Sequence, residues 1–176
     1  MPPDAEVRYV GLFPARGTTA TRLCITGLAD HAIAPYLVSI GWQGSIGALD
    51  RELSTLGAAH GAGVGIVDID VEAGGEIGPA IGLEYLFRRD AQTHATLAEH
   101  AFLDALVARA LCTPARRAAL AAFPLARYTV LPHELWESVL HRRVNHVKLT
   151  FERDAIRDAK AYLAIGYLPR RRRSIR

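Results

Sequence analysis

The stretch NHVKLTFERDAIRDAKAYLAIGYLP, residues 145–169, decides the fold because it predicts two paired strands joined by a turn. In both halves apolar residues alternate with polar ones, and β-branched and aromatic residues are frequent, as in a half-buried strand. The charged segment RDAIR, residues 153–157, separates the halves and predicts a five-residue turn. The stretch also holds Lys148 and Lys160, the two lysines among the 21 lysines and arginines of the chain.

Successive side chains of a strand point to opposite faces, so each predicted strand divides into two sets. In the last hairpin the apolar set, which we expect to pack against helices, is Val147, Leu149, Phe151, Leu163, Ile165 and Tyr167. The other set is polar and comprises His146, Lys148, Thr150, Lys160 and Tyr162. A five-residue turn would put Lys148 opposite Tyr162 and Lys160 opposite Thr150, with the two lysines diagonal to each other and roughly 7–8 Å apart.

Outside this hairpin, the remaining elements follow from hydrophobic spacing and from helix-start signals. Ser45 and Thr113 are suitable N-caps, Pro114 suits a first helical position, and Leu97, Phe102, Leu106 and Val107 form a predicted apolar stripe. The sequence predicts strands at 21–28, 63–72 and 79–89, and helices at 30–44, 45–61, 93–112, 113–123 and 131–143. Helices and hairpins without a βαβ pattern predict an α+β fold: an antiparallel sheet of about five strands in hairpins, with helices packed on one face.

The length of 176 residues predicts one α+β domain, residues 1–169, followed by a basic C-terminal tail, residues 170–176. The tail holds four consecutive arginines, Arg170 to Arg173, and a fifth at Arg176. Such a run is typical either of a segment that binds nucleic acid or an anionic surface, or of a solvated chain end. No aromatic residue interrupts the arginines, and this disfavours nucleic acid as a partner.

Composition and motifs exclude several classes of function. No apolar run approaches the roughly 18 residues that a membrane-spanning helix needs, and the first residues do not follow the pattern of a secretory signal. Cys24 and Cys112 form neither a disulfide framework nor a CxxC pair. The glycine-rich nucleotide-binding patterns, HExxH and GxSxG are absent. We therefore expect a cytoplasmic protein without a cofactor and without membrane partners.

The polar set of the last hairpin has counterparts on the other strands. Alternation places further charged residues on the same face, namely Arg22, Asp68, Asp70, Glu84 and Arg88. Small residues among them (Gly82, Ala164 and Gly166) would leave room over the sheet for a ligand. The alternative is an ordinary wet sheet face with charges of both signs. Asp68 and Asp70 are too far apart along a strand to hold Mg²⁺ without further ligands, so no metal is predicted.

The segments HVKLTF, residues 146–151, and AKAYLAIGYLP, residues 159–169, together with the order of elements, resemble the αββα (ABBA) prenyltransferases. In that family a ten-stranded barrel binds an allylic diphosphate through Lys, Arg and Tyr without an obligatory metal, and an acidic residue helps to activate an aromatic or peptide acceptor. The resemblance implies that Glu84 or Asp68 is the acidic residue. It implies a substrate-binding set of Arg22, Arg88, His146, Lys148, Lys160 and Tyr162. With about five strands the chain would form a half-barrel that needs a partner, or a degenerate binding relative.

Two functions are therefore predicted. The first is a metal-independent prenyl (allyl) transferase that binds an allylic diphosphate on the polar face and modifies an aromatic or peptide acceptor. The alternative is a non-catalytic accessory domain of a biosynthetic pathway that binds a peptide, a partner subunit or a second copy. For this alternative, open sheet edges would accept a strand, and Trp42 and Trp136 would serve as interface anchors.

Overall fold

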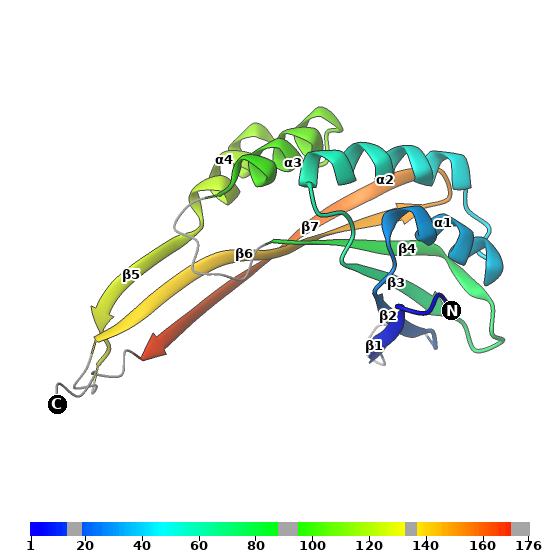
Figure 1. Cartoon of the computed structure of the whole chain (residues 1–176), viewed down its shortest axis with the longest axis horizontal. Helices are drawn as coiled ribbons and strands as arrows, with labels where there is room; N and C mark the ends of the chain where they lie inside the picture. Colours follow the sequence, from blue (N-terminus) through cyan, green and yellow to red (C-terminus); the bar gives the residue numbers. More distant parts are fainter. Residues whose placement is uncertain (14–18, 88–94, 133–136, 170–176) are drawn as a thin grey trace.

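The computed structural model describes residues 1–13, 19–87, 95–132 and 137–169. Within these ranges seven strands form one antiparallel sheet, and four helices lie on one side of it (Figure 1). The strands are β1 (Glu6–Leu12), β2 (Thr21–Thr26), β3 (Ile66–Val71), β4 (Ile77–Leu86), β5 (Leu125–Val130), β6 (Glu137–Glu152) and β7 (Ala155–Pro169). The helices are α1 (Asp30–Ser39), α2 (Ile46–His60), α3 (Leu97–Ala108) and α4 (Pro114–Ala122).

The sheet is organised around β6, the longest strand. The strand order is β1-β2-β3-β4-β6-β5, and β7 also pairs with β6. Since β7 lines one edge of β6 from Ser138 to Glu152, the opposite edge is shared by β4, which pairs with 146–152, and β5, which pairs with 137–142. The sheet is therefore open, with β7 on the outside.

The predicted sheet of about five strands, half-barrel or ABBA-like, is wrong, because the sheet is open and has seven strands. The sequence did not indicate β1 and β5, and residues 137–143, predicted to be helical, form the start of β6. The helix was predicted because apolar residues in 131–143 recur with helical spacing. In the structure, residues 137–143 are a strand because β5 and β7 form backbone hydrogen bonds with β6 on its two edges. Residues 133–136, including Trp136, lie outside the described ranges.

Helix boundaries follow the sequence signals more closely. The Ser45 side chain accepts a hydrogen bond from the Ala48 amide at the start of α2, and Gly61 ends that helix with a left-handed φ of 79°. Thr113 caps α4, with Pro114 in its first turn. The predicted stripe of α3 is partly wrong, since Leu97 is 89% exposed and Leu103 joins Phe102 and Leu106 in the core.

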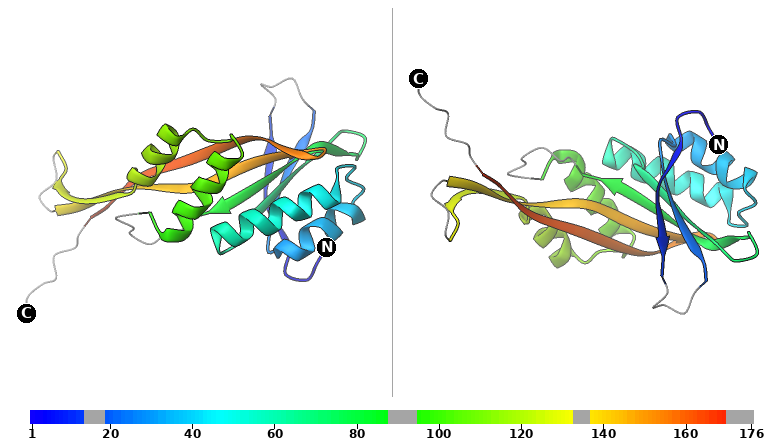
Figure 2. Two further views of the ribbon diagram at one scale, coloured as in Figure 1. Left: turned by 90° about the horizontal axis from the view of Figure 1, so that it is seen from above. Right: turned by 90° about the horizontal axis from the view of Figure 1, so that it is seen from below.

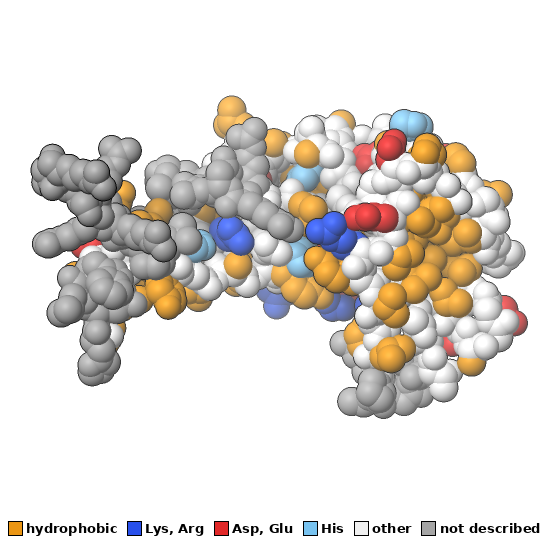
Figure 3. Space-filling model, turned by 60° about the horizontal axis from the view of Figure 1, so that its bottom comes forward, with side chains coloured by type: hydrophobic (Ala, Val, Ile, Leu, Met, Phe, Trp, Pro, Cys, Tyr) orange, Lys and Arg blue, Asp and Glu red, His pale blue; other side chains and the backbone are white. Residues whose placement is uncertain are grey.

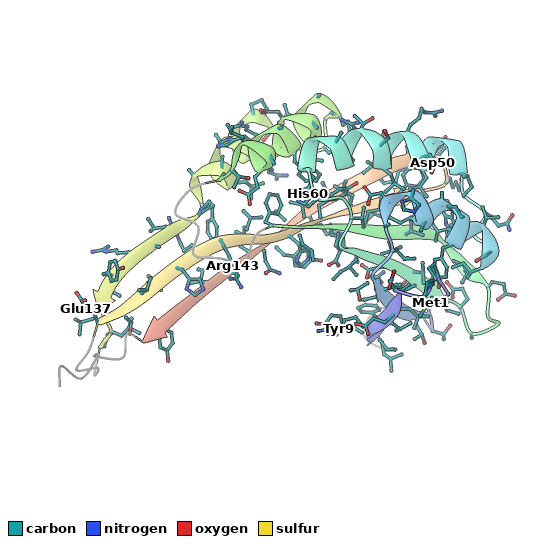
Figure 4. All side chains as sticks on the ribbon, viewed as in Figure 1. Met1, Tyr9, Asp50, His60, Glu137 and Arg143 are labelled. Carbon is teal, nitrogen blue, oxygen red and sulfur yellow. The ribbon has the colours of Figure 1, made fainter. Side chains whose placement is uncertain are left out.

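The core lies between the helices and one face of the sheet. Ile25, Val67, Leu83, Leu149 and Phe151 are each at most 1% exposed, and they come from four strands of the sheet, β2, β3, β4 and β6. His60, in the last turn of α2, packs edge-on against the rings of Tyr85, Phe87 and Phe102 (Figure 4). Trp42, predicted to be an interface anchor, is buried in this core and donates from Nε1 to the Pro79 carbonyl at 3.2 Å.

Beyond the helices, β5 and the adjoining ends of β6 and β7 project as a twisted ribbon (Figures 1 and 2). We call residues 125–130, 137–143 and 163–169 the arm. Leu163, Ile165 and Tyr167 were predicted to pack against helices, but they are 51%, 68% and 54% exposed. The prediction fails because β6 and β7 are longer than the helical layer that covers them.

The turn of the last hairpin is also shorter than predicted. It consists of Arg153 and Asp154, and Arg153 adopts a left-handed φ of 58°. The shorter turn, together with an irregularity between Thr150 and Phe151, pairs Lys148 directly with Lys160. In the described residues, no helix has the length and apolar character needed to cross a membrane.

Candidate functional site on the polar face

The sheet face opposite the helices carries a cluster of charged side chains, which we call the polar face. Its members are Arg22, Cys24, Asp68, Asp70, Gly82, Glu84, His146, Lys148, Asp158, Lys160 and Tyr162. Pairing across the sheet sets their positions: Cys24, Asp68, Gly82, Thr150 and Asp158 form one row, and Glu84, Lys148 and Lys160 form the next. Figure 3 shows this side of the molecule, with basic side chains near its middle and hydrophobic side chains gathered over the globular end.

Lys148 is the centre of the cluster. From β6 its side chain passes over Gly82 on β4 and forms an ion pair with Asp68 on β3. The two strands are separated by two strand spacings, or about 9.5 Å, a distance that the long lysine side chain spans. A methyl group on residue 82 would lie 2.7 Å from both Asp68 Oδ2 and Lys148 Cε. The absence of a side chain at Gly82 is therefore what allows this ion pair to form.

Asp68 is 2% exposed although it lies on the face that no helix covers. Its neighbours across the sheet are Cys24 and Gly82, and Lys148 lies over it. Its Oδ2 meets the Lys148 ammonium, whereas Oδ1 has no hydrogen-bond partner within the described part of the chain. A carboxylate that is buried with only one cation makes that cation important for the stability of the fold.

Glu84 lies beside this pair, with its Oε1 3.8 Å from Lys148 Nζ. Burial and, next to it, the negative charge of Asp68 together raise the pKa of Glu84 to about 7, although Lys148 opposes both effects. Burial likewise raises the pKa of the Cys24 thiol to about 12, with Asp68 contributing in the same direction. The protonation of Glu84 therefore changes near neutral pH.

The remaining cations of the polar face also have carboxylate partners. Arg22 forms a forked pair with Asp70, at 2.7 Å for both Nε to Oδ1 and Nη2 to Oδ2, and its guanidinium lies 4.9 Å from the centre of the Phe13 ring. Lys160 pairs with Asp158 at 2.9 Å, and its side chain is 61% exposed. Forked arginine–carboxylate contacts are the stronger of these arrangements.

His146 connects the cluster to β7. Its Nε2 lies 3.6 Å from Glu84 Oε2, and its ring stacks on the ring of Tyr162, with a centroid separation of 4.2 Å and an interplanar angle of 19°. The two residues pair across β6 and β7. The 3.6 Å separation is longer than a hydrogen bond, so a proton passes directly between Glu84 and His146 only after their side chains move closer together.

The structure brings together five of the eight residues proposed from the sequence: Asp68, Glu84, His146, Lys148 and Tyr162. Arg22 lies in a neighbouring row beside Asp70, and Lys160 turns toward Asp158. Arg88 lies outside the described residues.

Sequence reasoning missed two features of this face. Asp158 was left out of the predicted polar set, although the shorter turn places it on β7 opposite Thr150. Gly82 was interpreted as room for a ligand, but the Lys148 side chain fills that room. Gly166 was interpreted in the same way, and the ring of His141 occupies the space above it, 2.9 Å from where a methyl group would lie.

The charge balance decides what this face can bind. Each described cation of the predicted diphosphate site faces a carboxylate: Arg22 faces Asp70, Lys148 faces Asp68, and Lys160 faces Asp158. A diphosphate would have to displace these carboxylates, one of them buried. Within the described ranges, no group of three or more His, Cys, Asp or Glu side chains could hold a metal ion. The geometry therefore favours a structural ion-pair cluster, and prenyl transfer stays a prediction.

No protein-family model matches this chain, and no curated protein or solved structure was found to be similar to it.

Proposed function

We propose that this chain is a partner-binding domain that captures an extended segment of another polypeptide along the free edge of β7. One observation carries the proposal. β7 is 15 residues long and pairs with β6 on one side, while no described strand pairs with its other side. An exposed strand edge presents unpaired amide and carbonyl groups, and an added strand satisfies them.

The other two outer strands are poorer templates. β1 has seven residues and its pairing is irregular between Val7 and Tyr9, and β5 has six residues. Short or bulged edges resist strand addition, whereas long regular edges invite it. From Asp158 onward each residue of β7 pairs in step with β6, apart from one extra residue, Asn145, on the β6 side.

The side chains along the arm define the kind of partner strand. Leu163, Ile165 and Tyr167 alternate along β7 and are all more than half exposed. A strand added beside them would gain by presenting apolar residues at every second position on the same face. The occupant is therefore an extended peptide segment with alternating apolar and polar residues.

Three synthetic octapeptides test the proposal directly. The first is an alternating Val-Thr peptide flanked by glutamates for solubility, and the other two carry N-methyl groups on its odd or even amides. In strand addition, alternate amides point toward the edge and away from it, so one N-methylated series should lose binding and the other should keep it. Fluorescence anisotropy of the labelled peptides measures this, with sedimentation velocity at the same protein concentration to determine whether the chain also pairs with itself.

A matched pair of variants locates the site. Ile165→Asn on the arm should weaken peptide binding about five-fold or more, by removing an apolar neighbour of the added strand. Val38→Asn on α1 should leave binding unchanged, although Val38 is also 56% exposed. Equal binding by both N-methylated series, or an equal loss in the two variants, would contradict strand addition at β7.

The transferase prediction can be separated from this proposal with one ligand. Geranyl thiodiphosphate should not raise the melting temperature if the polar face is a structural ion-pair cluster. A metal-independent rise that Lys160→Met abolishes would instead favour a diphosphate site on that face. Lys160 suits this comparison because it is exposed, so its substitution leaves no buried carboxylate without a cation.

A further inference from the structure

A cavity of about 250 Å³ lies between α4 and the β6–β7 hairpin, on the side of the sheet opposite the polar face. Its walls are mainly apolar and are formed by Leu106, Leu111, Leu120, Val147, Ala159 and Ala161. Figure 2 shows α4 lying across β6 and β7 above this position. The two alanines are on the helix-facing side of β7, and their short side chains leave the space that larger residues would fill.

Two residues give this apolar cavity a polar side. Cys112 and Arg116 belong to its lining, and Arg116 is solvent-exposed. Burial raises the pKa of the Cys112 thiol and the positive charge of Arg116 lowers it, as expected for two groups that line the same cavity. In the described ranges no ion pair involves Arg116, in contrast to the neighbouring Arg117, which pairs with Asp104 at 2.8 Å.

We propose that this cavity binds a small amphiphile: a hydrocarbon chain between α4 and β7, with an anionic head group at Arg116. An apolar cavity of about 150 Å³ holds benzene, so a volume two-thirds larger suits roughly eight to ten carbons. One unpaired cation at the lining complements one anionic group, a carboxylate or a phosphate monoester. The site uses the opposite sheet face from the ion-pair cluster and does not depend on strand addition at β7.

Calorimetric titration of the full chain with octanoate, octyl phosphate and octanol tests the assignment. We expect the two anionic ligands to bind about three- to five-fold more tightly than octanol, the range of one partly exposed ion pair. Arg116→Gln should remove that preference without changing octanol binding, and Arg51→Gln, an exposed arginine on α2, should leave it intact. Whichever anionic ligand binds more tightly identifies the head group.

A second variant tests the hydrocarbon part. Ala159→Leu should fill the cavity and weaken all three ligands by at least about ten-fold, while filling of a cavity leaves the fold intact or more stable. Ala164→Leu places the same larger side chain on the opposite face of β7 and should bind as the wild type does. The proposal is overturned if no ligand binds the wild type, if octanol binds as tightly as both anionic ligands, or if Ala159→Leu retains full binding.

Discussion

The strands β6 and β7 pass through two environments, and they behave differently in each. In the globular part, Val147, Leu149 and Phe151 lie under the helices and are at most 1% exposed, while Lys148 on the opposite face is only 12% exposed. In the arm none of the described helices lies above these two strands, and Ile165 is 68% exposed. β6 and β7 pair with each other in both regions, so pairing alone does not determine whether a side chain of the hairpin is buried. Burial depends on whether helices or other side chains cover the face on which it lies.

The two lysines sharpen this contrast because they are direct partners across the hairpin. Lys148 reaches inward over Gly82 to a buried aspartate, whereas Lys160 turns to Asp158 at the surface. Like charges placed directly opposite each other on a sheet disfavour pairing, so each lysine is stabilised by its own carboxylate. The two lysines are therefore expected to differ in how much each contributes to the stability of the fold, although they are directly paired.

The largest predicted effect is the loss of Lys148. Lys148→Met should lower the free energy of unfolding by about 3–5 kcal/mol, because Asp68 would remain buried without its cation. Lys160→Met should change it by no more than about 0.5 kcal/mol, as is usual for an exposed position. Urea denaturation of the two variants beside the wild type measures the difference.

A double variant distinguishes loss of the ion pair from loss of packing by the lysine side chain. If the cost arises from the unpaired carboxylate, Lys148→Met combined with Asp68→Asn should be more stable than Lys148→Met alone. Equal stability of these two proteins would show that Asp68 is not what makes Lys148 important.

The next effect is a pH dependence of stability that comes from Glu84. Its pKa is about 7 in the folded protein, above the roughly 4.3 of an unfolded chain. Between these values the folded state holds a proton that the unfolded state has released. Stability from this group is therefore fully present below about pH 4.3 and is lost as pH rises through 7. After allowance for solvent screening, we expect a loss of about 1–2 kcal/mol.

Glu84→Gln should remove this part of the pH dependence, as measured by urea denaturation at pH 4.5 and pH 7.5. Glu76→Gln is the matched control, since Glu76 lies in the exposed β3–β4 turn. The other titrating groups are the same in these proteins. We therefore compare, for each protein, the change in its free energy of unfolding between pH 4.5 and pH 7.5. An unchanged pH dependence in Glu84→Gln would contradict the raised pKa.

The sequence allowed prediction of what depends on near neighbours along the chain. The caps at Ser45 and Thr113 and the alternation that separates Val147 from Lys148 are local signals, and the structure confirms them. From alternation alone, Asp68 and Glu84 could be placed on the same face as Lys148, and the ion pairs confirm that placement.

What could not be predicted depends on contacts between distant segments. The segments that form β5 and the first half of β6 become strands because β6 pairs with β5 on one edge and with β7 on the other. No local sequence pattern predicts this pairing. The turn length set the register, so an error there assigned the wrong partners to both lysines. The pairing of Lys148 with Asp68 joins residues 80 positions apart and requires Gly82 between them.

The smallest predicted effect on stability is in the arm. A substitution there tests whether the arm is less covered than the globular part of the hairpin. Ile165→Asn should change the free energy of unfolding by no more than about 0.5 kcal/mol, because the side chain is already 68% exposed. Leu149→Ala, on the same face of the adjacent strand but under the helices, should cost about 2–5 kcal/mol. Both values come from the same urea denaturation series. A cost for Ile165→Asn close to that of Leu149→Ala would mean that the arm is covered in solution by this chain itself, and its apolar side chains would then be unavailable to a partner strand.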